Sequence, residues 1–364
     1  MLTVLLLLAG FALLTLGGES LVRGSSRLAA MFGISPLVIG LTVVAFGTSA
    51  PELAVSVISA YAGKGDLAIG NVVGSNICNV LLILGLSALV APLVVNQQLV
   101  RLDVPLVIIA SLLIVPFGLD GTIGRLEGGV LFTGIIVYTV YVIRKSRSDA
   151  KQNRQEYEQA FGRDEPQNLK GGVISAALIM AGIGMLVLGS HWLVEAATAT
   201  ARYFGVTELV IGLTIVALGT SLPELATSVV ASLRGERDIA VGNVVGSNLF
   251  NLLSVLGLSS LVAPGGIPVP AAALHFDIPV MIAVAVACLP VLFINYQISR
   301  WNGAMFLGFY IAYLVDLVFT ATGHDAQAGF RHALVWFAIP ITSVALLVIT
   351  IKALRNGNPP ADPT

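Results

Sequence analysis

Two glutamates, Glu52 and Glu224, lie within long apolar stretches of the sequence. Glu52 is the only formally charged residue of the run Ser35–Ala62, and about 20 apolar residues suffice for a helix to cross a bilayer. Placing a charge at that depth costs roughly 2.5–3.5 kcal/mol on insertion scales, so such residues are usually retained for a function. This position predicts a functional carboxylate near the middle of a membrane.

The residues just before the first glutamate supply further oxygen atoms. The motif Gly47–Glu52 reads Gly-Thr-Ser-Ala-Pro-Glu. Pro51 has no N–H, so the carbonyl of Gly47 loses its helical partner, and Thr48 and Ser49 add two hydroxyl groups. A broken helix at membrane depth is tolerated where it lines a cavity or is buried in protein. Oxygen atoms with one negative charge are the ligands that a hard cation prefers.

The motif occurs a second time, 172 positions later, at Gly219–Glu224. At the same offset Leu37–Gly85 aligns with Leu209–Gly257 without a gap. The heptapeptide Gly70–Asn76 recurs unchanged at Gly242–Asn248. Self-similarity at a fixed offset indicates an internal structural repeat, so we expect two copies of one unit that share a site.

Serine and asparagine side chains follow each motif on the next expected helix. Ser75 and Asn79 are four residues apart and share one helical face, and Ser247 and Asn251 repeat them. Such residues also hydrogen-bond across membrane helices without binding an ion. Because each pair accompanies an intramembrane glutamate and is duplicated, we predict that they are oxygen ligands. Two roles stay open for four other asparagines, which could hold the helices together or contact the ion. They are Asn71, Asn76, Asn243 and Asn248.

The composition is that of a polytopic α-helical membrane protein. Of 364 residues, 56% are hydrophobic and 11% are charged, and the mean hydropathy is +0.92. A net charge of −1 gives no basis for a nucleic-acid partner. The sequence has no Walker A motif for ATP and no hydrolase constellation, and Cys78 and Cys288 have no metal or redox spacing. We therefore expect a protein of the lipid bilayer that is not an enzyme and needs no cofactor.

Apolar runs predict eleven membrane spans in an all-α fold. They cover residues 2–31, 35–62, 67–90, 104–119, 125–143, 171–201, 207–234, 239–262, 276–294, 300–320 and 332–352. Residues 1–143 and 171–320 then form two five-helix halves, joined by the hydrophilic linker 144–170, and residues 321–364 add one span and a tail. Since five is odd, the second half must cross the membrane in the opposite sense, which is the inverted-topology repeat of many secondary transporters.

Lysine and arginine residues predict how the spans are oriented, because they gather on the cytoplasmic side. Most of them become cytoplasmic if the N-terminus lies outside the cell membrane. The linker Arg144–Lys170 and the C-terminus are then cytoplasmic, and the loop Gly63–Gly65 is external.

Other polar residues near the spans receive structural predictions. Asp103 and Asp277 stand at expected helix starts, where an acidic residue usually caps the helix. Glu19 and His191 align with one another and are predicted to be solvated or to line a gate. Asp316 stays unassigned.

With both motifs and the helices that follow them in view, the sequence resembles the sodium/calcium exchanger family of the cation/calcium antiporter superfamily. The resemblance covers roughly residues 1–320 and implies ten helices in an inverted five-plus-five arrangement, with the first and sixth as a sliding gate. By motif position it implies ion ligands at Thr48, Ser49, Glu52, Ser75, Asn79, Thr220, Ser221, Glu224, Ser247 and Asn251. It also implies backbone carbonyl ligands at Ala45 and Ala217.

Two features depart from the family pattern. Many well-known members have an acidic residue at the position of Asn251, whereas here both halves carry asparagine. The linker is also too short for the family's large calcium-sensing domains. Two carboxylates neutralise one Ca²⁺, two Na⁺ or two H⁺. We expect an antiporter that exchanges Ca²⁺ for Na⁺, with Ca²⁺/H⁺ exchange as the alternative. A cation channel is less favoured, because an inverted repeat serves alternating access.

Overall fold

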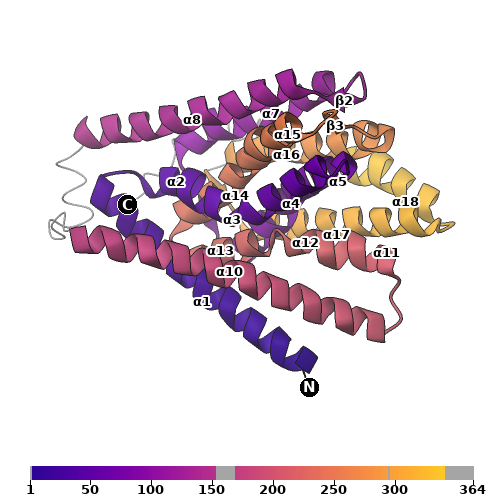
Figure 1. The fold of residues 1–364 in the computed structure, drawn as a ribbon, viewed down its shortest axis with the longest axis horizontal. Coiled ribbons are helices and arrows are strands. Elements are labelled where there is room, and N and C mark those ends of the chain that lie inside the picture. The colour runs from indigo at the N-terminus through magenta and orange to yellow at the C-terminus, as the bar shows by residue number, and fades with distance from the viewer. Residues whose placement is uncertain (1, 153–168, 294–295, 341–364) are drawn as a thin grey trace.

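The computed structural model describes residues 2–152, 169–293 and 296–340. In Figure 1 the long helices α1 (Leu2–Phe32) and α10 (Leu169–Tyr203) cross along one edge of the molecule. Helix α8 (Arg125–Gln152) runs along the opposite edge. The shorter, bent elements that carry both motifs lie between these edges.

Both halves follow the same order of elements, with π-helical segments (η) at corresponding places. In the first half, α1 is followed by α2 (Pro36–Ile39), η1 (Gly40–Val44), α3 (Ala45–Thr48), α4 (Ala50–Tyr61), α5 (Gly65–Cys78), η2 (Asn79–Leu84), α6 (Gly85–Val90), β1 (Leu93–Val94), η3 (Leu99–Asp103), α7 (Val104–Phe117), β2 (Thr122–Ile123) and α8. In the second half, α10 is followed by α11 (Glu208–Ile211), η4 (Gly212–Val216), α12 (Ala217–Gly219), α13 (Leu222–Leu233), α14 (Arg237–Leu249), η5 (Phe250–Val255), α15 (Leu256–Val262), β3 (Ile267–Pro268), η6 (Ala273–Asp277), α16 (Ile278–Phe293), β4 (Gln297–Ile298) and α17 (Arg300–Thr322). Segments α18 (Gln327–Ala333) and η7 (Leu334–Ala338) follow the repeat.

The prediction of an all-α protein with many membrane spans is confirmed. Among the described residues, eight single helices are long and apolar enough to cross a membrane. The pair Pro36–Thr48 and Ala50–Tyr61, bent by 48°, makes a ninth candidate span, and Leu222–Leu233 is a shorter apolar helix. The predicted eleventh span lies largely outside the described residues.

Two span boundaries differ from the sequence-based expectation. The fourth span begins at Leu99 and not at residue 104, because the π-helical segment η3 continues the helix through Arg101 and Asp103. The fifth span continues to Gln152 and not to residue 143. This extension is rich in Arg, Lys and Gln, which favour helix without needing an apolar face. Residues 153–168 of the predicted linker lie outside the described residues.

Helices α1 and α10 approach one another backbone to backbone. A Cβ atom added at Gly17 would lie 2.9 Å from the carbonyl oxygen of Gly182, and one added at Gly10 would lie 2.9 Å from that of Gly189. Small residues that allow such an approach are typical of helix pairs in membranes. The two helices therefore form one closely packed pair beside the bent elements.

Two short β-ribbons join the halves and indicate their relative orientation. Strand β1 pairs antiparallel with β4, and β2 with β3. In each ribbon one strand precedes the fourth span of its half, and the other follows the fourth span of the other half. The loops before and after a span lie on opposite sides of a membrane, so this pairing requires the two halves to cross in opposite senses. The ribbons therefore agree with the predicted inverted repeat.

Candidate functional site

The two motifs fold as helix breaks that face one another in the centre of the molecule. Helix α3 ends before Ser49, whose backbone leaves the helical region (φ −82°, ψ 6°), and α4 begins at Ala50. Ser221 has nearly the same angles (φ −90°, ψ 4°) between α12 and α13. Each proline stands in the first turn of the helix after the break, where its missing N–H does no harm. The predicted breaks are thus present in both halves.

Hydrogen bonds cross between the halves at these breaks. The Ser49 hydroxyl donates to Glu224 Oε1 at 2.9 Å, and the Ser221 hydroxyl lies 3.2 Å from Glu52 Oε1. Ser221 also lies 3.2 Å from the hydroxyl of Ser75 on α5. Each glutamate therefore meets the broken helix of the opposite half, and the two motifs form one shared site.

Asn71 and Asn243 fasten each half to the other in the same way. The Asn71 amide donates to the Ser56 hydroxyl at 2.9 Å and to the Glu52 carbonyl at 3.3 Å. Its Oδ1 accepts a hydrogen bond from Thr220 at 3.3 Å. Asn243 repeats all three contacts. Its partners are Ser228 at 2.9 Å, the Glu224 carbonyl at 3.3 Å and Thr48 at 3.1 Å. Both amides hold the helices together, which was one of the two roles left open for them.

Ser56 and Ser228 are buried neighbours of the candidate site that the sequence analysis missed. Both are fully buried and receive the amides of Asn71 and Asn243. They align at the 172-residue offset of the repeat, so a search for identical polar residues at that offset would have found them.

The centre of the site is buried and holds oxygen atoms that lack a hydrogen-bond partner among the described residues. Glu52 is 1% exposed and Glu224 is 0% exposed. Among the described residues, five oxygen atoms of the predicted ligands are buried without a partner: Glu52 Oε2, Glu224 Oε2, Asn79 Oδ1, Asn251 Oδ1 and Ser247 Oγ. A buried polar atom without a partner is costly. The site therefore has the donor set and the unsatisfied oxygens that a cation would complete.

The two predicted carbonyl ligands differ in their surroundings. The Ala45 carbonyl accepts from the Ser49 backbone N–H at 2.9 Å and from the Thr48 hydroxyl at 3.3 Å. In the other half the Ser221 backbone N–H donates instead to Leu218, at 3.1 Å. Ala45 is buried and Ala217 is exposed, so the repeat is not symmetrical at this point.

Access to the site differs between the two sides. Helix α14 packs closely on the first half, since a Cβ at Gly242 would lie 2.8 Å from the Leu37 carbonyl and one at Gly246 would lie 2.7 Å from the Leu41 carbonyl. On α5 the corresponding glycines, Gly70 and Gly74, have no described atom within 4 Å of such a Cβ. Among the described residues, one approach is therefore closed and the other is open at Gly70 and Gly74.

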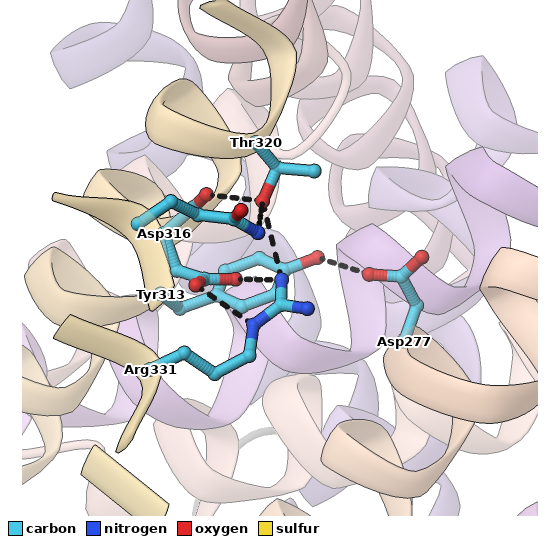
Figure 2. Close-up of polar contacts among 6 residues, drawn as sticks. Asp277, Tyr313, Asp316, Thr320 and Arg331 are labelled. Carbon is cyan, nitrogen blue, oxygen red and sulfur yellow. Dashed lines mark hydrogen bonds and ion pairs between the residues drawn. The ribbon is translucent and has the colours of Figure 1, made fainter. Parts of the chain in front are cut away.

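A second polar cluster joins α18 to the second half. Figure 2 shows Arg331 donating two hydrogen bonds to Asp316, at 2.7 and 3.0 Å, beside Thr320. In the same view Tyr313 reaches the carboxylate of Asp277 at 3.3 Å. Asp316, unassigned from sequence, is 2% exposed and forms an ion pair that fastens α18 to α17.

The predicted capping role of Asp103 is wrong. Its side chain makes no capping hydrogen bond to α7 and instead accepts from Tyr138 of α8 at 3.0 Å. Asp277 accepts from Tyr313 in the corresponding arrangement. Each aspartate thus ties the fourth span of its half to the fifth.

Glu19 forms ion pairs with Arg23 and Arg234, whereas His191 lies 4.0 Å from Glu195.

The described residues contain no group of three or more His, Cys, Asp or Glu side chains that could hold a metal. Besides its two carboxylates, the central site offers hydroxyl and amide oxygens. This chemistry suits a hard cation that passes through and not a transition metal held permanently.

Comparison with known proteins decides the family. The family model described as sodium/calcium exchanger protein matches residues 2–144 and 174–319. This chain belongs to the sodium/calcium exchanger family. It is 34% identical over 345 residues to the sodium/calcium exchanger MaX1 of Methanosarcina acetivorans, covering 86% of this chain and 98% of that one. It is 36% identical over 291 residues to inner membrane protein YrbG of Escherichia coli, covering 79% and 89%.

A solved structure shares the fold of this exchanger. It is that of the sodium–calcium exchanger NCX_Mj soaked with zero Na⁺ and Ca²⁺, with a TM-score of 0.73 and 31% identity over 87% of this chain and 99% of that one. The protein is therefore a multi-pass membrane transporter, a cation/Ca²⁺ antiporter, and not an enzyme.

Proposed function

We propose that this exchanger moves Ca²⁺ across the cell membrane in exchange for Na⁺, with both ions using the site between the two helix breaks. The observation that carries the proposal is the pair of fully buried glutamates, each bonded to a serine of the opposite half and each with one oxygen left without a described partner. Two carboxylates balance the charge of one Ca²⁺ or of two Na⁺, so the two kinds of ion compete for the same pair of negative charges.

The ligands form two matching sets, one from each half. Glu52, Thr48, Ser49, Ser75 and Asn79 supply side-chain oxygens in the first half, with the Ala45 carbonyl. Glu224, Thr220, Ser221, Ser247 and Asn251 supply them in the second, with the Ala217 carbonyl. The buried unpartnered oxygens support this assignment for both glutamates, both asparagines and Ser247.

The difference between the two approaches supports alternating access. In the present state α14 closes on η1, while Gly70 and Gly74 of α5 have no described atom against them. Because the halves are related by a repeat, the opposite state has α11 and η4 closed on α5 and α14 released. A pair of buried carboxylates without a bound ion is too costly to carry through such a change. The site must therefore bind Ca²⁺ or Na⁺ before the protein changes from one state to the other.

The proposed orientation places the N-terminus outside and the linker in the cytoplasm. The open face of α5 then leads to the external loop Gly63–Gly65, and the structure represents an outward-open state. Labelling single cysteines from one side of intact cells tests this. Linker residues that react with an impermeant reagent from outside would reverse the orientation.

We propose Na⁺ and not H⁺ as the coupling ion. Asn79 and Asn251 keep a carbonyl oxygen for a metal ion but cannot carry a proton, so proton coupling would depend on Glu52 and Glu224 alone. The remaining ligand positions carry hydroxyl and amide oxygens, which a desolvated metal ion needs and a proton does not.

The test is Ca²⁺ uptake into proteoliposomes of the purified full chain. One set carries an outward Na⁺ gradient without a pH gradient, and the other carries a pH gradient without Na⁺. We expect uptake only with the Na⁺ gradient. Uptake that follows the pH gradient and ignores Na⁺ would replace the proposal with Ca²⁺/H⁺ exchange, and uptake that needs neither would indicate a channel.

A further inference from the structure

A hydrogen bond between two buried asparagines of opposite halves lies next to the proposed ion site. The Asn79 Nδ2 atom, at the start of η2, donates to Asn248 Oδ1 of α14 at 3.0 Å. The two side chains are 1% and 3% exposed. Asn79 lies one helical turn after Ser75, which contacts Ser221 and through it Glu52.

The bond determines which end of the Asn79 amide is available to an ion. An amide has a donor end and an acceptor end, and only the oxygen can bind a cation. With Nδ2 held by Asn248, the Asn79 Oδ1 atom is left buried without a partner among the described residues. A freely rotating amide would present its N–H groups to the cation for part of the time.

The corresponding bond on the other side has both its partners but is not formed. Asn76 is committed through Nδ2 to the Val72 carbonyl at 2.7 Å, so it can offer only its oxygen, which is buried and unpartnered. Asn251, the repeat equivalent of Asn79, has both Nδ2 and Oδ1 buried without a described partner. A matching acceptor, Asn76 Oδ1 of the first half, and donor, Asn251 Nδ2 of the second half, are thus both present without a described partner.

We propose that Asn248 and Asn76 are positioning residues for ion binding. Asn248 holds the amide nitrogen of Asn79 in this structure, and Asn76 takes the same part toward Asn251 in the opposite state, so that each ligand amide turns its oxygen to the ion. The inference rests on the proposed function of the central site. It assigns to Asn248 and Asn76 a role in selectivity for metal ions, whereas Asn71 and Asn243 hold the helices.

Replacing Asn248 tests the proposal through binding as well as transport. Removing an outer partner of a metal ligand typically costs 10–100-fold in affinity, so Asn248→Ala should raise the KM for Ca²⁺ roughly 10-fold. It should reduce the Ca²⁺-induced rise in melting temperature of the detergent-solubilised protein. Asn248→Leu roughly keeps the side-chain volume but removes the hydrogen-bond acceptor, so it should have the same effect as Asn248→Ala. Asn302→Ala, which breaks the capping box of α17, is the matched control and should lower the melting temperature without changing the KM.

The decisive arm repeats the substitution in an Asn79→Asp background. A carboxylate has two equivalent oxygens and needs no orientation, so Asn248→Ala should there change Ca²⁺ affinity less than about threefold. An equal loss in both backgrounds would show that Asn248 acts by packing and would overturn the proposal. Loss of Ca²⁺ stabilisation in Asn79→Asp alone would also contradict it, because a carboxylate oxygen serves wherever an amide oxygen does.

The outcomes separate this inference from the proposed function. A wild-type protein whose melting temperature responds to neither Ca²⁺ nor Na⁺ would overturn both. A wild-type protein that responds, beside an Asn248→Ala variant with the same KM and the same response, would overturn only the role of Asn248.

Discussion

The first and second halves of this exchanger contain the same heptapeptide, at Gly70–Asn76 and at Gly242–Asn248, in two different environments. In α14 the heptapeptide is entirely buried, whereas in α5 its first residue is exposed and two others are half-buried. The residues that face the two heptapeptides differ in exposure in the same way. Val44 of η1 is 0% exposed, and its repeat equivalent Val216 of η4 is 49% exposed.

This difference teaches that the open and closed approaches are alternatives for one sequence and not properties of two sequences. The same seven residues are entirely buried in α14, whereas in α5 Gly70 and Gly74 have no described atom near an added Cβ; under the proposed alternating access, both arrangements are available to each copy. The glycines permit the closed arrangement because a side chain at Gly242 or Gly246 would meet a backbone carbonyl. An exchanger that alternates needs the two arrangements to be close in free energy.

The largest expected effect comes from the glutamates, where the two halves are alike. Glu52→Gln and Glu224→Gln should each abolish Ca²⁺ transport, because removing one of two buried charges that share an ion costs about 3–5 kcal/mol, or 100-fold or more in affinity. Both variants should stay folded, with an ion-free melting temperature at or above that of wild type. Near-normal Ca²⁺ flux in either variant would show that the halves do not share one site.

The second prediction uses substitutions at two glycines to shift the equilibrium between the two states in opposite directions. Overpacking typically costs about 1–3 kcal/mol, so Gly246→Ala should disfavour the present state and Gly74→Ala should disfavour the opposite one. In a background without Cys78 and Cys288, a cysteine at position 44 should label about 10-fold faster with Gly246→Ala. With Gly74→Ala, a cysteine at position 216 should label faster and transport should slow.

The control for the glycine experiment is Gly184→Ala, at an exposed position of α10 with open space around it. It should change neither labelling rate. If Gly246→Ala and Gly74→Ala shift the labelling in the same direction, the two arrangements are not alternatives and the comparison between the halves fails.

Much of the site could be predicted from the sequence because its physical causes are local. Pro51 follows Gly47 by four residues and removes the N–H that the Gly47 carbonyl would need, and a lone Glu52 in an apolar run must face protein or an ion. The repeat then required two such breaks and predicted that they meet. The crossed bonds from Ser49 to Glu224 and from Ser221 to Glu52 agree with that prediction.

The open approach could not be predicted from the sequence, since identical heptapeptides give no reason to prefer one half. The role of Asp103 was misjudged for a related reason. Capping was argued from its position at a helix start, whereas its partner Tyr138 comes from the next span and depends on how the helices pack. Asp316 stayed unassigned because its partner Arg331 lies outside the repeat. Contacts that depend on the packing of distant segments have no local signal.

A smaller effect is expected from an ion pair between the two halves that has no counterpart at the repeat-related positions. Glu19 of α1 pairs with Arg234 at the end of α13, and the repeat equivalents, His191 and Ala62, cannot do so. The pair ties the α1–α10 edge to the core in this state. Because Glu19 is 24% and Arg234 48% exposed at the side chain, the contribution should stay below about 1 kcal/mol.

The measurement is again labelling of a cysteine at position 44, which should rise about threefold in Glu19→Gln and less at high salt. Combining it with Arg234→Gln should add little, because both changes remove the same interaction. Additive effects would mean that the two residues act separately and that the pair does not bias the exchanger toward this state.

The smallest effect is expected from an exposed ion pair at the C-terminal end of α10. Arg202 at the end of α10 makes two hydrogen bonds to Glu208 at the start of α11, at 2.5 and 2.9 Å. Both side chains are more than half exposed, so water and salt screen their attraction. Arg202→Gln should therefore change labelling at position 216 less than twofold, although the pair connects α10 directly to the segment that stands open. If Arg202→Gln has the larger effect of the two ion-pair variants, a surface tie and not the packing of glycines on α5 and α14 controls which half is open.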